Sequence, residues 1–274
     1  MTLRIRSKAL RKDRVRGSLG AALAAALCSW TAPATAQEQD KLNEANNPLT
    51  PKITINFQDY YDPSLYGLSG RDANQFLFRG VVPWKLGDSG QLFRFTMPIA
   101  TAPTFPTGSD TGLGDITLLN VTPFKGPDHV LFAAGPVLVL PTGDRIHGQG
   151  AWQMGAAGVA VAPQSWGIVG GFLTYEHSIG DTNTGVPANL LTFQPLVNVN
   201  LPQQFYLRSS ATWTFDLEQS GSFIPLGLGI GRVFLLDGGN SLNAYIEPQY
   251  SVWHDGPGTP QWQIFAGLNM QFSL

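Results

Sequence analysis

A few charged and amide side chains occupy the polar positions of segments in which polar and apolar residues alternate. Because successive side chains of a β-strand point to opposite faces, these groups are expected to share one face, away from the apolar residues. Three guanidinium groups and one carboxylate that face a common space could bind anions, including aromatic carboxylates. The same groups could instead pair with each other as a polar core, and the sequence leaves both interpretations open. The residues are Arg79, Arg94, Arg208, Glu247, Gln194, Asn198 and Gln249.

The sequence carries no compact motif typical of a catalytic or metal site. Its four histidines form neither an H-x-x-x-H nor an H-E-x-x-H pattern. His177 and Ser178 are adjacent, and some lipid hydrolases use a Ser/His pair in a barrel, but neighbouring strand residues point to opposite faces. The stretch DTGLGD (110–115) could hold calcium, although turn chemistry explains its residues more simply. We expect no enzyme, cofactor or metal, and keep a lipid hydrolase as a minor alternative.

The first 36 residues have the form of a secretory signal peptide. Seven basic residues are followed by the apolar run LGAALAAALCSW and by Ala34-Thr35-Ala36, a typical cleavage site. The run is shorter than the about 20 residues that a membrane-spanning helix needs. Cleavage after Ala36 would remove the single cysteine and move the formal charge from −2 to −8, since seven of 17 basic but one of 19 acidic residues are lost. Such acidity argues against nucleic acid as a partner.

The remaining chain is expected to form one all-β domain over residues 52–274. Residues 37–51 are polar and contain two prolines, and we interpret them as a flexible periplasmic lead-in. Segments of about ten residues then alternate polar and apolar side chains, which is typical of a transmembrane antiparallel up-and-down β-barrel. A closed barrel satisfies its backbone groups internally and crosses a bilayer without helices. Twelve strands are expected, at 52–60, 75–84, 91–99, 114–123, 129–141, 152–162, 166–178, 190–200, 205–215, 223–234, 241–252 and 261–274.

The connections between these segments alternate in length. FKGPD, PQS and LPQQ are short, whereas YDPSLYGLSGRDA, TAPTFPTGSDTGL and IGDTNTGVPA are longer and rich in turn residues. Short periplasmic turns and long outer loops are typical of barrels in the bacterial outer membrane. Amphipathic rings favour the two membrane interfaces, and six tryptophans fall at expected strand ends. They are Trp84, Trp152, Trp166, Trp213, Trp253 and Trp262.

The last eight residues, GLNMQFSL, predict the strand that closes the barrel against the first strand. Its apolar positions, from Leu268 to Leu274, alternate with polar ones and are expected to face lipid. The segment also resembles the terminal signal by which the barrel assembly machinery recognises its substrates. A charge in place of Leu274 is therefore expected to impair assembly. The elements of the signal are Gly267, Met270, Phe272 and Leu274.

Prolines inside several expected strands conflict with a regular wall, because proline removes a ladder hydrogen bond. A closed barrel has no edge strand to accommodate them, so bulges or kinks are expected at these positions. Such kinks could open a lateral gap for an apolar solute. The prolines are Pro98, Pro136, Pro195, Pro225 and Pro248.

Five stretches resemble one known family, the outer-membrane barrels of the meta-pathway of phenol degradation, whose members are often misnamed neuromedin U. The resemblance covers about residues 50–274. It implies a barrel that moves small, in part aromatic, compounds, and it assigns no site residues. The stretches are GPVLVLPTGD (135–144), GQGAWQMG (148–155), FYLRSSATWTFD (205–216), FIPLGLGIGRVF (223–234) and NAYIEPQYSV (243–252).

These observations predict a porin-like outer-membrane channel or facilitator for small solutes, aromatic or anionic ones among them. Its expected partners are outer-membrane lipid, the barrel assembly machinery and the solute. A plugged structural barrel is the main alternative. A barrel of twelve strands lies between the filled eight-stranded and the open 16-stranded type, so size does not decide between them.

Overall fold

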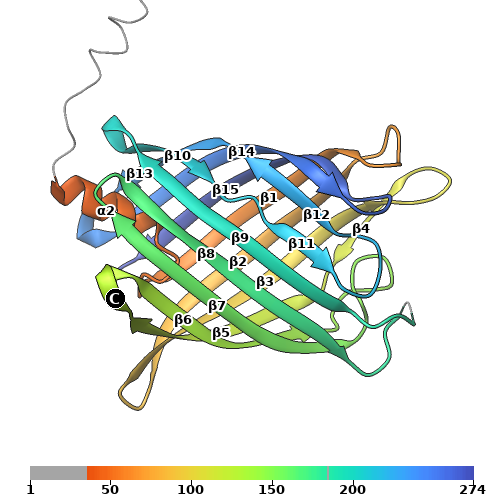
Figure 1. Ribbon diagram of the computed structural model, residues 1–274, viewed down its shortest axis with the longest axis horizontal. Coiled ribbons are helices and arrows are strands. Elements are labelled where there is room, and N and C mark those ends of the chain that lie inside the picture. Colours follow the sequence, from red (N-terminus) through yellow and green to blue (C-terminus); the bar gives the residue numbers. More distant parts are fainter. Residues whose placement is uncertain (1–35, 184) are drawn as a thin grey trace, which may run out of the picture. The chain divides into compact units, whose positions relative to one another are not determined.

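The wall of the barrel consists of strands that pair with antiparallel neighbours. The computed structural model describes residues 36–183 and 185–274, so the expected signal peptide lies outside the described residues except for Ala36. The last strand returns to the first and closes the sheet (Figure 1). The strands are β1 (Ile53–Leu65), β2 (Ala73–Leu86), β3 (Ser89–Pro103), β4 (Ser109–Leu113), β5 (Ile116–Lys125), β6 (Leu131–Leu140), β7 (Trp152–Gln164), β8 (Gly167–Ile179), β9 (Asn189–Asn200), β10 (Phe205–Ser209), β11 (Trp213–Asp216), β12 (Phe223–Gly227), β13 (Gly229–Leu235), β14 (Ser241–His254) and β15 (Pro260–Phe272).

These segments make twelve wall strands, as expected from the sequence, because three wall strands are interrupted. β4 and β5 share one position in the wall, β10 and β11 share a second, and β12 and β13 share a third. The last two interruptions fall inside the expected strands 205–215 and 223–234. The closed antiparallel barrel is therefore confirmed, with local breaks that the alternation did not show.

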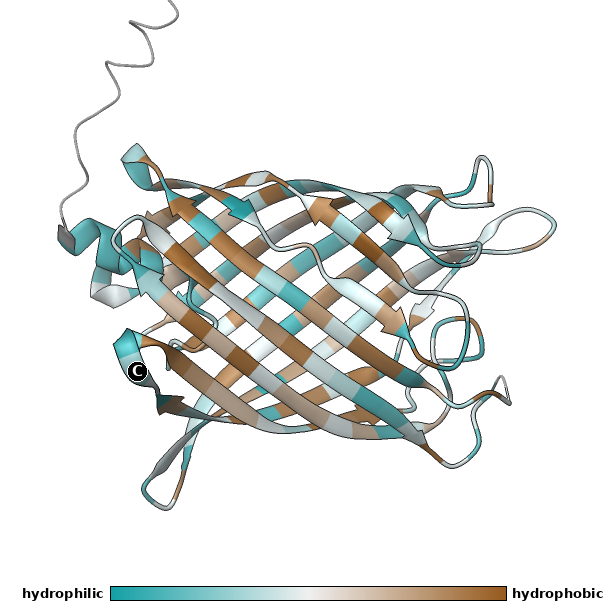
Figure 2. Ribbon diagram, viewed as in Figure 1, coloured by the Kyte–Doolittle hydropathy of each residue, from teal (hydrophilic) through white to brown (hydrophobic). Residues whose placement is uncertain are grey.

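The predicted alternation decides which side chains face the interior. In β14, Ile246 and Val252 are exposed on the outer face, whereas Asn243, Glu247 and Ser251 are buried inside the barrel. The outer face is apolar, as a wall in contact with lipid requires. Figure 2 shows the resulting alternation of apolar and polar residues along the strands.

Short connections gather at one end of the barrel, the short-turn end, and long connections at the other, the loop end (Figure 1). Three connections at the short-turn end are the 3-10 turns η1 (Pro127–His129), η2 (Pro202–Gln204) and η3 (Asp237–Gly239). In η3 the chain adopts positive φ at Gly238, a conformation that glycine allows at no steric cost. At the loop end, residues 101–113 form more than the expected loop, since they complete β3 and add β4.

Five of the six tryptophans lie at the two ends of the wall strands. Trp84 and Trp166 lie toward the short-turn end, and Trp152, Trp253 and Trp262 lie toward the loop end; all five are exposed. Trp213 differs, because it begins β11 in the middle of an interrupted wall strand. The five are placed as two interfacial girdles.

Residues 37–51 are ordered, and the expectation of a flexible lead-in is wrong. They form helix α2 (Ala36–Asn46) and a turn, which we call the plug (residues 36–51), at the short-turn end (Figure 1). Leu42 and Ala45 lie on one face of the helix and Leu49 lies in the turn that follows it; all three are buried, so packing holds the segment in place. Leu42 joins a cluster with Tyr206 and other barrel side chains. Among the described residues, no helix is both long and apolar enough to cross a membrane.

The C-terminal strand pairs with β1 as predicted, with Ile53 opposite Phe272. Leu268 and Phe272 are exposed on the outer face. The expected end of the strand is wrong, because β15 stops at Phe272 and Leu274 lies beyond it, 82% exposed. Gly267 lies against the Tyr245 ring, where a Cβ would clash, so glycine is needed there for packing.

Replacing Leu268 with Arg is expected to destabilise the folded barrel by about 2–4 kcal/mol, because it places a charge on the lipid face in mid-strand. Leu274→Arg should cost close to nothing, since that position lies beyond the strand. Urea titration of both variants in the same lipid vesicles, with the folded fraction read from heat-modifiable gel migration, measures the difference. Equal losses in the two variants would contradict this placement of the strand.

Candidate solute site in the barrel lumen

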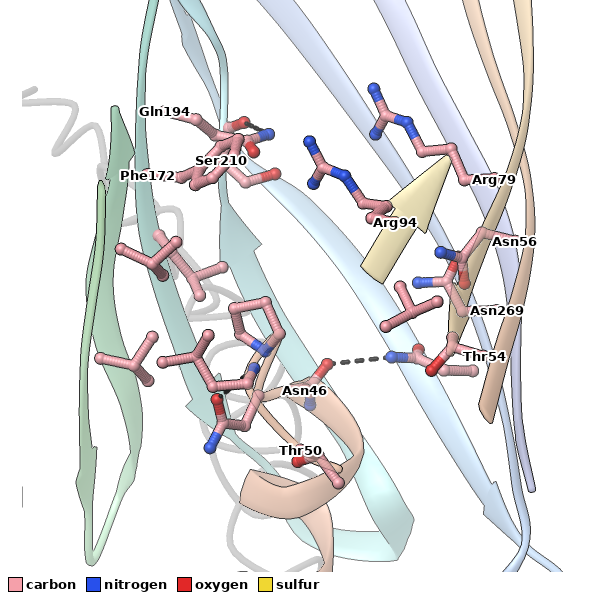
Figure 3. A pocket seen from close by; sticks show the side chains of 18 of the residues that line it. Asn46, Thr50, Thr54, Asn56, Arg79, Arg94, Phe172, Gln194, Ser210 and Asn269 are labelled. Atoms are coloured by element: carbon pink, nitrogen blue, oxygen red, sulfur yellow. Dashed lines mark hydrogen bonds between the residues drawn. The ribbon is translucent and has the colours of Figure 1, made fainter. Parts of the chain in front are cut away.

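A cavity of about 200 Å³ lies inside the barrel next to the plug. Figure 3 shows Asn46 and Thr50 of the plug toward one end of this cavity and Arg79 and Arg94 toward the other. An apolar cavity of about 150 Å³ can hold benzene, so the space suits one small aromatic molecule with a polar substituent.

The two sides of the cavity differ in polarity. Strands β1, β14 and β15 contribute mainly amides and a hydroxyl, among them Thr54, Asn56, Gln58, Asn243, Asn269 and Gln271. Strands β3, β5 and β7–β9 contribute mainly apolar groups, among them Leu92, Leu119, Val121, Val159, Phe172 and Leu196. A molecule with an apolar body and a polar edge would therefore match both sides at once.

Arg79 extends from β2 into the polar side of the cavity. Its Nη1 donates a hydrogen bond of 2.7 Å to Oε1 of Gln58, whose own amide nitrogen donates to the Tyr245 hydroxyl at 2.8 Å. The Nε of Arg79 is buried and has no hydrogen-bond partner in the described part of the chain. The guanidinium is thus oriented by a neutral amide and retains a donor for a ligand.

Arg94 lies on β3, and its guanidinium is 4.8 Å from the centre of the Phe172 ring. Glu176 of β8 attracts this cation from beyond salt-bridge distance. Among the described residues, neither Arg94 nor Arg79 forms a salt bridge. Guanidinium groups bind carboxylates through paired N–H donors, so this side of the cavity can receive an anionic group.

Arg208 is neutralised, unlike the other two arginines. Its Nε donates to Oε2 of Glu247 at 2.8 Å, and its guanidinium lies 3.5 Å from the centre of the Tyr245 ring. Glu247 is fully buried and also accepts 2.8 Å hydrogen bonds from the backbone N–H and the hydroxyl of Ser210. This region is a polar core, in which the charged residues pair with each other. Arg79 and Arg94, in another part of the lumen, remain able to bind an anion.

The side chains expected in the lumen all lie on the inner face. Five of them line the cavity: Arg79, Arg94, Arg208, Gln194 and Asn198. Glu247 and Gln249 are buried away from its lining. Gln194 donates to the carbonyl of Ser210 at 2.9 Å, which ties it to the polar core.

Sequence reasoning missed the apolar side of the cavity and the plug. The inward residues of the segment LFAAGPVLVL (131–140) are apolar, as are those facing lipid, so alternation carries no signal there. For the plug, the apolar spacing of Leu42, Ala45 and Leu49 is a weak signal, because it is short, lies in a polar segment and extends past the end of the helix.

The plug closes the cavity toward the short-turn end. Asn43 donates to the carbonyl of Gln164 at 2.8 Å, Asn243 donates to Asn46 at 2.9 Å, and Gln271 donates to the carbonyl of Ala45 at 3.3 Å. Such bonds contribute about 1 kcal/mol each, and burial of a leucine contributes about 1.5–3 kcal/mol. Passage along the barrel axis would therefore have to displace a segment held by several interactions.

Two outer loops meet around His147 at the loop end. Its Nδ1 lies 2.8 Å from the Asp144 carboxylate and its Nε2 lies 3.2 Å from the Asp110 carbonyl. In the described part of the chain, Asp110, Asp144 and His147 form the one group whose ligand atoms are close enough together to hold a metal ion. The carboxylate of Asp115 accepts hydrogen bonds from the backbone N–H groups of Gly143 and Gln149, so it ties DTGLGD to the next outer loop and does not make the local turn contacts that were expected.

His177 and Ser178 lie on β8 and alternate between its faces. The Ser178 hydroxyl oxygen accepts a 3.0 Å hydrogen bond from the backbone N–H of Ala188. This matches the expectation that adjacent strand residues do not pair with each other.

The structure is similar to solved outer-membrane barrels. The COG4313 outer membrane channel from Pseudomonas putida F1 matches with a TM-score of 0.61 and 15% identity, covering 83% of this chain and 98% of its own. The translocator domain of the autotransporter NalP from Neisseria meningitidis matches with a TM-score of 0.42 and 15% identity, covering 93% of this chain and 98% of its own. No family description and no curated protein matches the sequence.

The closed twelve-stranded wall with an apolar outer face defines the fold of an outer-membrane β-barrel. Within that class, the fold is like that of the channel from Pseudomonas putida F1.

Replacing Glu247 with Ala is expected to destabilise the barrel by about 3–5 kcal/mol, because it leaves the Arg208 guanidinium buried and unpaired. Combining Arg208→Met with Glu247→Leu should recover most of this loss, since apolar groups of similar volume can replace a buried pair. As a control, Glu44→Ala breaks the more exposed Glu44–Lys52 pair and should cost less than about 1 kcal/mol. Urea unfolding in lipid vesicles measures all three, and a double variant as unstable as Glu247→Ala would refute this account.

The contact between the outer loops is expected to depend on pH. Burial of the ring lowers the pKa of His147, but the Asp110 carbonyl and the Asp144 carboxylate outweigh it and raise this pKa above its ordinary value of 6.5. The stabilisation is therefore complete below pH 6.5 and is lost as the pH rises through the raised pKa. Hydrogen exchange of residues 141–151 should quicken over that interval beyond the intrinsic effect of pH. His147→Gln should abolish the excess, and an unchanged profile would contradict the role of the ring.

Proposed function

We propose that the protein is an outer-membrane channel or facilitator for small solutes that combine an aromatic or apolar body with an anionic group. The divided cavity carries the proposal. Arg79 and Arg94 lack salt bridges among the described residues and are available to an anion, while Phe172 and its apolar neighbours offer a surface for a ring. This arrangement suits an amphipathic solute better than a neutral, evenly polar one such as a sugar.

Two likenesses support this proposal. The sequence resembles the barrels of the meta-pathway of phenol degradation, which implies small aromatic compounds. The fold is like that of a protein named as an outer membrane channel. We propose no catalytic role, cofactor or metal.

The orientation in the membrane follows from the ends of the barrel. The proposal places the short-turn end and the plug in the periplasm and the long loops outside, after export by the signal peptide and its cleavage at Ala36. Outer-membrane lipid contacts the apolar face, and the barrel assembly machinery would recognise the C-terminal strand through Gly267, Met270 and Phe272, with Leu274 beyond it.

A plugged structural barrel is the second candidate, and the plug itself favours it. Residues 36–51 close the floor of the cavity, and the Arg208–Glu247 pair fills part of the lumen. Transport requires that the plug moves or that the solute leaves by another route, so a flux measurement separates the two functions.

Refolded protein in liposomes should pass benzenesulfonate, which stays charged at all accessible pH values, faster than a neutral sugar of similar size. Arg94→Gln should lower the sulfonate flux about tenfold, because a hydrogen bond to a charged group contributes about 1.5 kcal/mol or more. Lys85→Gln removes the same charge from an exposed position outside the cavity and should leave the flux unchanged. If a correctly folded barrel passes neither solute, the structural role is the better account.

A further inference from the structure

The backbone ladder of the wall is broken on one side of the cavity. β10 pairs with β13 up to Arg208 opposite Gly229, and β11 pairs with β12 only at Thr214 opposite Phe223. These two registers are in phase, so the rungs between them are missing, from Ser209 opposite Leu228 to Trp213 opposite Ile224. Figure 1 shows β10 and β11 as separate arrows joined by an irregular segment.

The segment from Ser210 to Thr212 is also unpaired on its other side. β9 pairs with β10 as far as Val197 opposite Ser209 and resumes with Phe193 opposite Trp213. Prolines lie near the break on the two adjacent wall strands and on the one beyond: Pro195 on β9, Pro225 on β12 and, beyond β12, Pro248 on β14. They lack the N–H group that would complete a ladder.

Side chains of the polar core take over the backbone hydrogen bonds at the break. The N–H of Ser210 donates to Glu247 at 2.8 Å, and the carbonyl of Ser210 accepts from Gln194 at 2.9 Å. Ala211 is only 2% exposed, although it belongs by alternation to the outer face. The wall is held here by side chains instead of strand pairing.

At the break, a single layer of residues separates the cavity from the membrane. Ser210 lines the cavity, together with Gln194 and Leu196 on the adjacent strand β9. On the outer face, Leu226 and Leu228 are 54% and 65% exposed, so lipid would contact them. Residues 210–212, which lack ladder pairing on both sides, thus lie between the cavity and the apolar interior of the bilayer.

We propose that this break is a lateral portal, through which a neutral aromatic solute passes between the cavity and the apolar interior of the membrane. The portal consists of residues 210–212 and 225–228. The inference rests on the proposed transport function and assigns one class of solute, the uncharged aromatics, to a route through the wall.

The competing route along the axis is closed by more interactions. Displacing the plug breaks its hydrogen bonds to β7, β9, β14 and β15 and exposes Leu42 and Leu49. Opening the portal breaks the hydrogen bonds of Ser210 with Glu247 and Gln194, but no ladder hydrogen bonds between β11 and β12 at the missing rungs. The charge of a solute decides whether it can leave through the portal. An anion held by Arg79 and Arg94 would have to enter hydrocarbon unpaired, which is strongly unfavourable, but a neutral ring would not.

A reversible cross-link tests the portal. Ala211→Cys and Leu226→Cys stand opposite each other at the missing rungs, and the only natural cysteine, Cys28, lies in the expected signal peptide. Arrival of 1-naphthol in the outer membrane of intact cells is followed by its fluorescence, and passage of naphthalene-1-sulfonate is followed in liposomes. Leu207→Cys with Ile230→Cys, a pair within the intact β10–β13 ladder, is the matched control.

Oxidation of the portal pair should reduce naphthol arrival to the level of cells without the protein, leave sulfonate flux unchanged, and be reversed by reductant. Oxidation of the control pair should change neither. If oxidation abolishes the transport of both solutes, the cross-link blocks the lumen. If it affects neither, solute does not cross at this segment. Either result overturns the portal. If the reduced protein passes neither solute, the proposed function itself fails.

A second variant tests the portal without a cross-link. Pro225→Val supplies a backbone N–H opposite Thr212 and should slow naphthol arrival. Pro123→Val, in a rung that is already paired with Ala133, is the control and should leave the rate unchanged. Equal rates in the two variants would count against the portal even if the cysteine pair fails to oxidise.

Discussion

Every backbone N–H and C=O group in the wall must find a partner within the protein, because the bilayer interior offers none. Pairing of β15 with β1 meets this requirement for the ends of the sheet. Closure then fixes the face on which each side chain lies, and it places Arg79, Arg94 and Arg208 together inside. Where the ladder fails, at Ser210, side chains of Glu247 and Gln194 supply the missing partners. The polar core therefore stabilises the wall as well as filling part of the lumen.

The same closure brings together two halves of a lumen that differ in chemistry. Amides and Arg79 line one side, and aliphatic groups with Phe172 line the other, where Arg94 lies over the Phe172 ring. The arginines are not equivalent, because Arg208 is neutralised by a fully buried carboxylate while Arg79 is oriented only by an amide. A buried cation with a carboxylate partner belongs to the scaffold, whereas one oriented by neutral groups remains available to an anion.

The plug and the break in the ladder are complementary. The plug closes the cavity along the axis through side-chain hydrogen bonds and buried leucines. The break leaves residues 210–212 of the lateral wall without ladder pairing on either side. A solute that reaches the cavity from the loop end therefore meets the plug along the axis and the unpaired segment in the wall. In the proposal, the charge of the solute decides which of these two routes it takes.

By itself, the sequence determined the strands, their number and the face of nearly every lumen residue, because a period of two is a local property of the chain. It failed where that signal is missing: β6 is apolar on both faces, and the helical spacing of Leu42, Ala45 and Leu49 is short and set in a polar segment. Only the tertiary structure decided which inward groups meet. Arg208 and Glu247 are 39 positions apart, and Arg94 reaches Phe172 across the lumen. Alternation tells on which face a side chain lies, but partners across a barrel depend on how the closed sheet curves and staggers, which is a property of all its strands together.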